Sequence, residues 1–198
     1  MLTSEIAACC KELKLSHNIV EMAERVQAES HQEYLLKLLR SELEHRESQR
    51  KDKFLKNAGF YSIKTLDGFR FDEVTLPASV SPDYLRNCEF VNTKTNLVMY
   101  GNVGTGKTFL SIALGVEACK KGIETQFFRT AALVNRLSEA KKSGVLSAFM
   151  KKLSKAELLI CDEWGYVPLD RTGAQLLFEV ISECYERNTL IINTNIEF

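Results

Sequence analysis

The 198-residue chain carries 26 Lys and Arg side chains against 26 Asp and Glu side chains, so its formal net charge is zero. A protein without excess positive charge has no general attraction to DNA, and any contact with nucleic acid must come from a local basic patch. No apolar run is long enough to cross a bilayer, and Met1–Ile6 lacks the basic start and apolar centre of a signal peptide. We therefore expect a cytoplasmic protein without a membrane partner.

The cysteines predict neither a disulfide framework nor a metal site. They include no C-x-x-C pair, and none has zinc-ligand spacing with a histidine. We expect small buried hydrophobes in a reducing compartment. The six are Cys9, Cys10, Cys88, Cys119, Cys161 and Cys184.

Residues 1–66 have a polar, helical pattern and predict a small N-terminal α-helical domain. Capping-box spacing occurs at Asn18–Glu21 and again at Ser30–Glu33, where helices are expected to begin. The helix after Ser30 is amphipathic, and we expect its apolar face to pack on the two earlier helices. That face carries Leu35, Leu36, Leu39 and Leu43.

The far end of this helix is locally basic. Arg46, Arg50 and Lys53 follow i, i+4, i+7 spacing, so one face could track a phosphate backbone and bind DNA without sequence preference. Such binding would fall steeply with salt. The alternative is a solvated helix face that balances nearby acidic side chains. The complete basic set is Arg46, Arg50, Lys51, Lys53 and Lys56.

Between Gly59 and Pro82 glycines and prolines interrupt any helix, and Asp83–Asn92 predicts a short one. We place a domain boundary near residue 66, with an ATPase core over 67–198. The apolar stretch Asn96–Tyr100 then leads into a glycine-rich turn followed by a helix-forming segment. This is the strand, loop and helix of a P-loop, with complete G-x-x-x-x-G-K-T spacing.

The P-loop predicts binding of ATP and Mg²⁺. Its glycines allow backbone amides to turn inward around an anion, and the following helix directs its positive end at the same point. Lys107 would reach the β- and γ-phosphates, and the Thr108 hydroxyl would ligate Mg²⁺. The expected nucleotide-binding set is Gly101, Asn102, Val103, Gly104, Thr105, Gly106, Lys107, Thr108 and Phe109.

A second motif follows the next predicted strand, Glu124–Arg129, and two predicted helices. Leu158–Glu163 is an apolar strand that ends in adjacent carboxylates, which is typical of a Walker B strand. Neighbouring side chains on a strand diverge, so the two carboxylates can take different roles. We expect Asp162 at the Mg²⁺ site opposite Thr108, and Glu163 as the residue that orients or deprotonates the attacking water.

The last elements are a helix expected to begin at Thr172 and a buried strand, Thr189–Asn195, with a polar end. Asn193 and Asn195 at this end are either turn residues or sensors of the γ-phosphate, because strand ends form the ligand crevice of such a sheet. The alternation of apolar strands and capped helices predicts an α/β fold, a parallel sheet with helices on both faces.

These motifs resemble the IstB family of ATPases, helpers of insertion-sequence transposition. The resemblance is carried by Gly101–Thr108, Leu158–Leu169 and Cys184–Arg187, with Tyr34–Glu42 similar to the family's N-terminal helical signature. The family belongs to the AAA+ P-loop NTPases, near the DnaC-type helicase loaders. Matching by motif places Asn195 at the sensor-I asparagine.

The resemblance implies an ATPase that forms an ATP-dependent homo-oligomer, binds DNA non-specifically and activates a partner transposase. Two alternatives stay open. One is a DnaC-like loader with a helicase partner in DNA replication, and the other is a nucleotide-binding remnant without turnover. Family members continue beyond Phe198 into a fifth strand, arginines that act across subunits and a helical lid. Without that strand, Leu97–Tyr100 is expected to be an exposed, apolar sheet edge.

Overall fold

A computed structural model describes residues 2–166, 168–185 and 187–196. The chain divides into two compact units, one ending at Lys53 and the other beginning at Phe54. The boundary expected near residue 66 falls inside the second unit, because Leu66 is 5% exposed and belongs to that unit's hydrophobic core.

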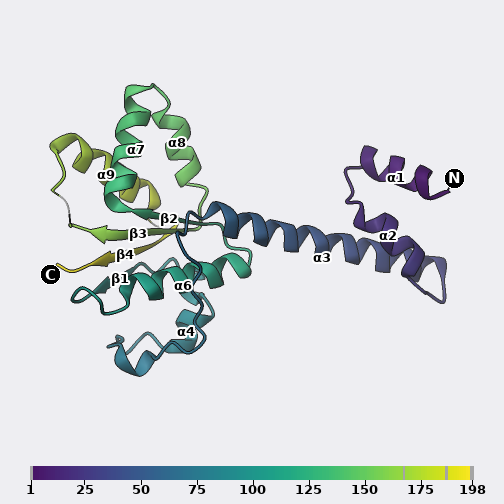
Figure 1. Ribbon diagram of the computed structural model, residues 1–198, viewed down its shortest axis with the longest axis horizontal. Helices are drawn as coiled ribbons and strands as arrows, with labels where there is room; N and C mark the ends of the chain where they lie inside the picture. The colour runs from purple at the N-terminus through teal and green to yellow at the C-terminus, as the bar shows by residue number, and fades with distance from the viewer. Residues whose placement is uncertain (1, 167, 186, 197–198) are drawn as a thin grey trace. The chain divides into compact units, whose positions relative to one another are not determined.

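The first unit is helical. It contains α1 (Leu2–Glu12), α2 (Asn18–Arg25) and most of α3 (His31–Asn57), whose last turn enters the second unit (Figure 1). Its small apolar core consists of Cys10, Ile19 and Val20. Ser30 accepts a hydrogen bond from the Glu33 amide at 3.1 Å, which fits the helix start expected there.

The expected packing of the α3 leucines is wrong. Leu35, Leu36, Leu39 and Leu43 are 56%, 47%, 45% and 67% exposed.

A polar face of α3 meets the first two helices instead. The Tyr34 hydroxyl donates to the Ala23 carbonyl at 2.7 Å, and Asn18 donates to Ser41 at 3.0 Å. Glu42 is 3% exposed, and one of its oxygens accepts from the Ser16 amide at 3.0 Å. A buried carboxylate must be hydrogen-bonded, so this network fixes which face of α3 turns inward.

The second unit begins with an irregular segment that contains a short 3₁₀ turn (Phe71–Glu73), α4 (Pro82–Arg86) and α5 (Glu89–Asn92). The single helix expected over Asp83–Asn92 is broken at Cys88, whose φ of 57° is left-handed. Phe90 and Val91 from α5 are buried in the sheet's core.

The described strands form one parallel sheet in the order β1-β4-β3-β2. Their bounds are β1 (Leu97–Tyr100), β2 (Thr125–Arg129), β3 (Leu158–Trp164) and β4 (Thr189–Thr194). β1 lies at one edge with Val98 and Tyr100 53% and 61% exposed, which confirms the apolar edge expected from the sequence. At the other edge, the Phe127 amide donates to the Ala58 carbonyl at 2.7 Å.

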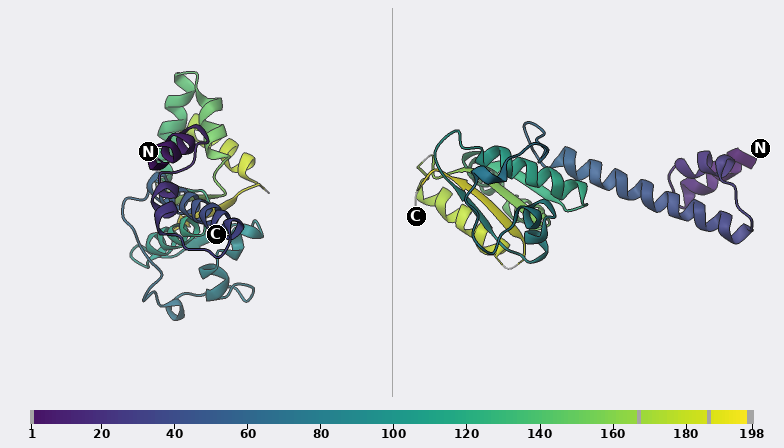
Figure 2. Two further views of the ribbon diagram at one scale, coloured as in Figure 1. Left: turned by 90° about the vertical axis from the view of Figure 1, so that its right-hand side faces the viewer. Right: turned by 90° about the horizontal axis from the view of Figure 1, so that it is seen from below.

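Helices cover both faces of this sheet, as expected. α6 (Lys107–Lys120) and α4 lie on one face, and α7 (Thr130–Lys142), α8 (Leu146–Leu153) and α9 (Arg171–Cys184) lie on the other (Figures 1 and 2). Each face has its own hydrophobic cluster, with Ile160 pointing to the α6 side and Leu159 to the α7–α9 side. The second unit therefore has the α/β architecture of a P-loop NTPase.

Local details differ from the expectations at two places. α9 begins at Arg171, with the Asp170 carboxylate accepting from the Gly173 amide at 2.6 Å, so Asp170 caps this helix rather than Thr172. Cys9 is exposed, whereas the other five cysteines are buried as expected. Within the described residues, no helix is both long and apolar enough to span a bilayer.

Candidate functional site

The loop between β1 and α6 has the backbone that a phosphate cradle needs. Gly101, Gly104 and Gly106 have φ of 148°, 86° and 87°, in a region that side chains disfavour. α6 begins at Lys107, directly after the last of these glycines. The unpaired amides of its first turn therefore face the loop, and a helix start of this kind attracts anions.

The Lys107 side chain lies within this loop. Its ammonium donates to the backbone carbonyls of Gly101 at 2.7 Å and Asn102 at 2.8 Å. The Thr105 hydroxyl donates to the Asn102 carbonyl at 2.9 Å. These contacts hold a positive charge beside the loop's amides, where phosphate oxygens would meet both kinds of donor.

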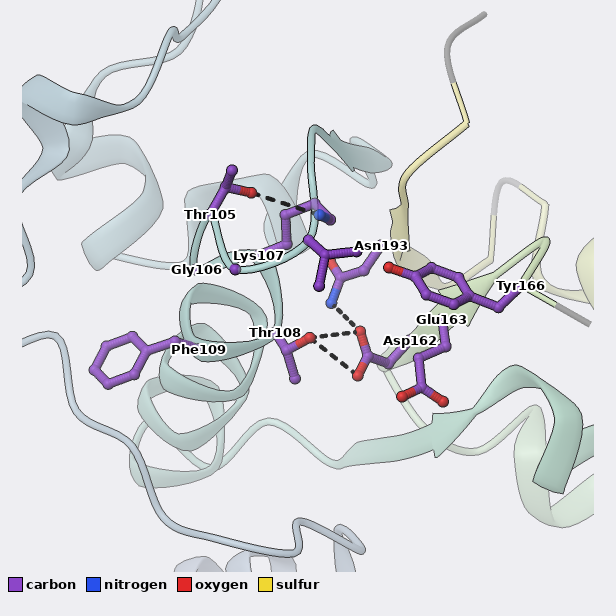
Figure 3. A pocket seen from close by; sticks show the side chains of 11 residues that line it. Thr105, Gly106, Lys107, Thr108, Phe109, Asp162, Glu163, Tyr166 and Asn193 are labelled. Atoms are coloured by element: carbon purple, nitrogen blue, oxygen red, sulfur yellow. Dashed lines mark hydrogen bonds between the residues drawn. The ribbon is translucent and has the colours of Figure 1, made fainter.

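Across the loop, the end of β3 brings Asp162 against the start of α6. The Thr108 hydroxyl donates to the two carboxylate oxygens of Asp162 at 2.9 and 3.1 Å, although the residues are 54 positions apart (Figure 3). Asp162 is only 3% exposed, and its backbone carbonyl accepts from the Thr130 hydroxyl at 2.8 Å. The sequence expectation that Asp162 lies opposite Thr108 is therefore matched by the geometry.

β4 contributes Asn193 to the same cluster. Its amide donates to Asp162 Oδ1 at 2.8 Å and to the Ser111 hydroxyl at 2.7 Å, and the residue is 1% exposed. The side-chain oxygen of Asn193 is buried without a partner among the described residues. Asn195, which motif matching assigned to this role, follows the end of β4 and is exposed outside the cavity. In this structure Asn193, rather than Asn195, is therefore the asparagine that lines the cavity and contacts Asp162.

Glu163 diverges from Asp162, as expected for neighbours on a strand. The pairing of β3 with β4 shifts register between Cys161 and Trp164, and Glu163 within this bulge has a left-handed φ of 56°. Its carboxylate points away from Asp162 in Figure 3 and lies 3.8 Å from the Arg129 guanidinium. A non-glycine residue in this region of backbone space is strained, and such strain is common at functional sites.

Together these elements enclose a cavity of about 370 Å³ at the carboxyl ends of the strands. Gly101 and Asn102 do not line it, and they contribute instead through the carbonyls that hold Lys107. The sequence reasoning missed Tyr166. The sequence signal for Tyr166 was the preceding Gly165, which permits a tight turn back toward the site after the two carboxylates. The lining residues are Val103, Gly104, Thr105, Gly106, Lys107, Thr108, Phe109, Asp162, Glu163, Tyr166 and Asn193.

The donor set suits Mg²⁺ held jointly with a nucleotide rather than a metal caged by protein alone. Within the described residues, no three His, Cys, Asp or Glu side chains converge on one point. Asp162 and Thr108 supply one buried carboxylate and one hydroxyl. Mg²⁺ typically takes one or two carboxylates, with substrate phosphates and water completing its shell. The residues present therefore fit this ion.

The thiol beside the site is not a nucleophile. Burial, together with the neighbouring Cys184 and Asp162, raises the pKa of Cys161 to about 12. Only a thiolate attacks efficiently, so Cys161 acts as a residue of the hydrophobic core.

Comparison of sequences groups this chain with one family. The profile of the family described as IstB-like ATP binding protein matches residues 8–198. The chain is 34% identical over 172 residues to an ATP-binding protein of insertion sequence IS5376 from Geobacillus stearothermophilus, covering 85% of this chain and 67% of that protein. It is 30% identical over 200 residues to the corresponding IS21 protein of Pseudomonas aeruginosa, covering 96% and 74%. This chain thus spans roughly two thirds to three quarters of these relatives.

Solved structures show the same fold. A DnaC helicase loader superposes with a TM-score of 0.54 at 27% identity, covering 68% of this chain and 77% of that one. DnaA from Aquifex aeolicus, solved with AMPPCP bound, gives a TM-score of 0.54 at 24% identity, covering 67% and 42%. Both likenesses support the AAA+ P-loop NTPase fold that the family resemblance implied, and the order of the strands agrees with it.

Proposed function

Because this chain belongs to the family of IstB-like ATP-binding proteins, we propose that it hydrolyses MgATP as a helper of insertion-sequence transposition. The observation that carries the proposal is the convergence of Lys107, Thr108 and Asp162 on one cavity. A phosphate cradle, a buried carboxylate and a hydroxyl at its edge are the parts that phosphoryl transfer requires.

Each residue has a separate role in this proposal. Lys107 would leave the Gly101 and Asn102 carbonyls to pair with the β- and γ-phosphates. Thr108 and Asp162 would hold Mg²⁺, which supplies neutralisation of the charge that develops on the phosphate oxygens. Asn193 keeps Asp162 in place by donating to Oδ1.

Glu163 is the proposed general base. Its carboxylate is the only one besides Asp162 that lines the cavity among the described residues, and Asp162 is already hydrogen-bonded. Since Glu163 lies 3.8 Å from Arg129, its side chain must rotate away from this exposed pair to reach a water beside the γ-phosphate. Exposed ion pairs contribute at most about 1 kcal/mol, so breaking the pair with Arg129 has only a small energetic cost.

Two variants separate nucleotide binding from hydrolysis. Lys107→Ala removes a cation that contacts phosphate, and we expect ATP affinity to fall by about 10–100-fold. Glu163→Gln keeps the side-chain shape without the base, so ATP should stay bound while turnover falls about 100-fold or more. Equilibrium binding of fluorescent ATP and steady-state phosphate release measure the two quantities. Equal loss of ATP affinity in both variants would contradict the role given to Glu163.

DNA is the proposed macromolecular partner, and the structure offers two basic surfaces for it. On α3, Arg46 is engaged with Glu42 at 2.6 Å and with the Lys14 carbonyl, and Lys51 pairs with Glu47 at 2.6 Å. The α3 surface is thus partly neutralised. The second surface is formed by α7, α8 and the turn that follows α8, and its exposed lysines are Lys141, Lys142, Lys151, Lys152 and Lys155.

Matched double variants distinguish these surfaces. Lys151→Ala/Lys152→Ala and Lys53→Ala/Lys56→Ala each remove two charges, from α8 and α3 respectively. The surface that contacts phosphates should lose affinity and show a flatter salt dependence, by about 0.9 in log–log slope for each lost contact on duplex DNA. The measurement is DNA affinity against salt concentration with ATP present. Wild-type behaviour of both variants would exclude both surfaces.

A second candidate function is loading of a replicative helicase, favoured by the 27% identity with a DnaC helicase loader. The same ATP site and DNA contact would serve either role, and assembly into an ATP-dependent homo-oligomer is part of both proposals. Pull-down of a purified transposase or helicase from the same genome, with ATP and with ADP, distinguishes them. ATP-dependent binding of the helicase alone would replace the transposition proposal.

A further inference from the structure

Tyr166 is a cavity residue that the P-loop chemistry described above does not use. It follows the carboxylate pair in a tight turn, Glu163–Tyr166, closed by the Tyr166 amide donating to the Glu163 carbonyl at 3.3 Å. Two residues of this turn, Glu163 and Gly165, have left-handed φ of 56° and 80°. The strained turn thus brings a second polar side chain, besides Glu163, to the same cavity.

The phenol lies on the strand side of the cavity, across from the phosphate loop. Figure 3 shows its hydroxyl end directed toward Asn193 and Lys107, whereas the Glu163 carboxylate points in a different direction. The residue is 43% exposed, and its hydroxyl has no hydrogen-bond partner within the described part of the chain. A tyrosine in the hydrophobic core would bury its ring, and Tyr166 belongs to neither large apolar cluster.

We propose that the Tyr166 hydroxyl donates a hydrogen bond to the terminal phosphate of bound ATP and thereby favours ATP over ADP. This inference rests on the proposed function, since it places a triphosphate in the cavity. A phenol is neutral at pH 7 and can donate without adding charge. Its bond to a phosphate oxygen is charge-assisted, and such bonds are among the stronger ones in proteins.

The position of the hydroxyl identifies the phosphate concerned. Lys107 and Thr108 begin α6, so they approach the nucleotide from the loop. Tyr166 approaches from the ends of β3 and β4, where Asp162 and Asn193 also lie. The γ-phosphate, which ATP has and ADP lacks, would lie between the residues of the loop and the residues at the strand ends. ADP would leave the Tyr166 hydroxyl solvated, so the bond separates the two nucleotides.

The test compares Tyr166→Phe with wild type in equilibrium binding of ATP, AMPPCP and ADP. Loss of one hydrogen bond to a charged group should lower ATP and AMPPCP affinity by about tenfold. ADP affinity should be unchanged. Tyr185→Phe is the matched control, because Tyr185 is 64% exposed and lies outside the cavity. The melting temperature without nucleotide checks that neither substitution disturbs the fold.

The outcomes separate the inference from the proposed function. Equal affinities of wild type and Tyr166→Phe for all three nucleotides would overturn the assignment of Tyr166, and so would an equal loss for ATP and ADP. Wild-type protein that binds no nucleotide would overturn the proposed function itself. Lys107→Ala, which should lose both ATP and ADP, shows in the same assay that a binding defect is detectable.

Discussion

The hydrogen bonds of Asn193 in β4 lead to a prediction that distinguishes it from Asn195. Asn193 donates to the buried Asp162 carboxylate at 2.8 Å and to Ser111 at 2.7 Å, whereas Asn195 is exposed. In Asn193→Ala, loss of a bond to a charged acceptor costs about 2 kcal/mol and loss of the neutral bond about 1 kcal/mol. The second unit should therefore lose about 3 kcal/mol of stability, or about 6–12 °C in melting temperature.

We also expect Asn193→Ala to lower the ATPase rate more than Asn195→Ala does. Without its amide partner, the Asp162 carboxylate keeps only the Thr108 hydrogen bonds. In the proposed function it would then be held less firmly for Mg²⁺, and we expect turnover to fall by about 100-fold. Asn195→Ala is the matched control, and its stability should stay within about 0.5 kcal/mol of wild type. Thermal unfolding by circular dichroism and steady-state ATPase rates measure both effects. A larger effect from Asn195→Ala than from Asn193→Ala would refute the reasoning.

Three further predictions concern stability and thiol chemistry. Burial alone would raise the pKa of Glu42, but hydrogen bonds from Ser16 and Arg46 outweigh it and hold the pKa below its usual value. Its stabilisation is therefore complete above the unfolded-state pKa of about 4.3 and lost as pH falls through the lower folded value, and Glu42→Gln should flatten this acid-side dependence in melting curves. Gly115→Ala should destabilise the second unit by about 1–3 kcal/mol in urea unfolding, because the new Cβ would lie 2.7 Å from Ile160 and Phe60, and wild-type stability would contradict that packing. A thiol reagent at pH 8 should modify Cys9 alone in the native protein, so rapid labelling of Cys9→Ser would show that a buried thiol is accessible.

The phosphate-binding part of the site was predictable because its chemistry is encoded in contiguous spacing. The loop's glycines, Lys107 and Thr108 occupy fixed positions between a strand and a helix, so local sequence determines their geometry. Asp162 was predictable for a related reason. It ends an apolar strand, and strand ends of a parallel sheet meet at one edge.

The sequence could not choose between Asn193 and Asn195, because strand side chains repeat every second residue. Both asparagines would face the same side of an extended strand, so periodicity does not show which of them lines the site. The end of β4 decides between them. Pairing of β4 with β1 and β3 ceases at Thr194, and Asn195 lies beyond it. The residue at which a strand ends depends on its pairing with neighbouring strands, and the sequence alone does not show that pairing.

The leucines of α3 illustrate a different limit. Helical periodicity predicts that a face is apolar, but it does not say what that face contacts. The leucines stay exposed because the buried Glu42 carboxylate accepts from the half-buried Ser16, and this contact turns another face of α3 inward. A satisfied polar network specifies orientation more strictly than a stripe of interchangeable leucines.

Asp162 explains why the sheet order matters for the site. Its carboxylate accepts from Thr108 after β1 and from Asn193 on β4, while its carbonyl accepts from Thr130 after β2. Because β4 lies between β1 and β3, Asn193 reaches the same Asp162 carboxylate that Thr108 contacts. A buried, charged acceptor shared by several strands couples their positions, since moving any one of them leaves a polar group unpaired. The order of the strands is therefore part of the site, and motifs on β1 and β3 alone cannot form it.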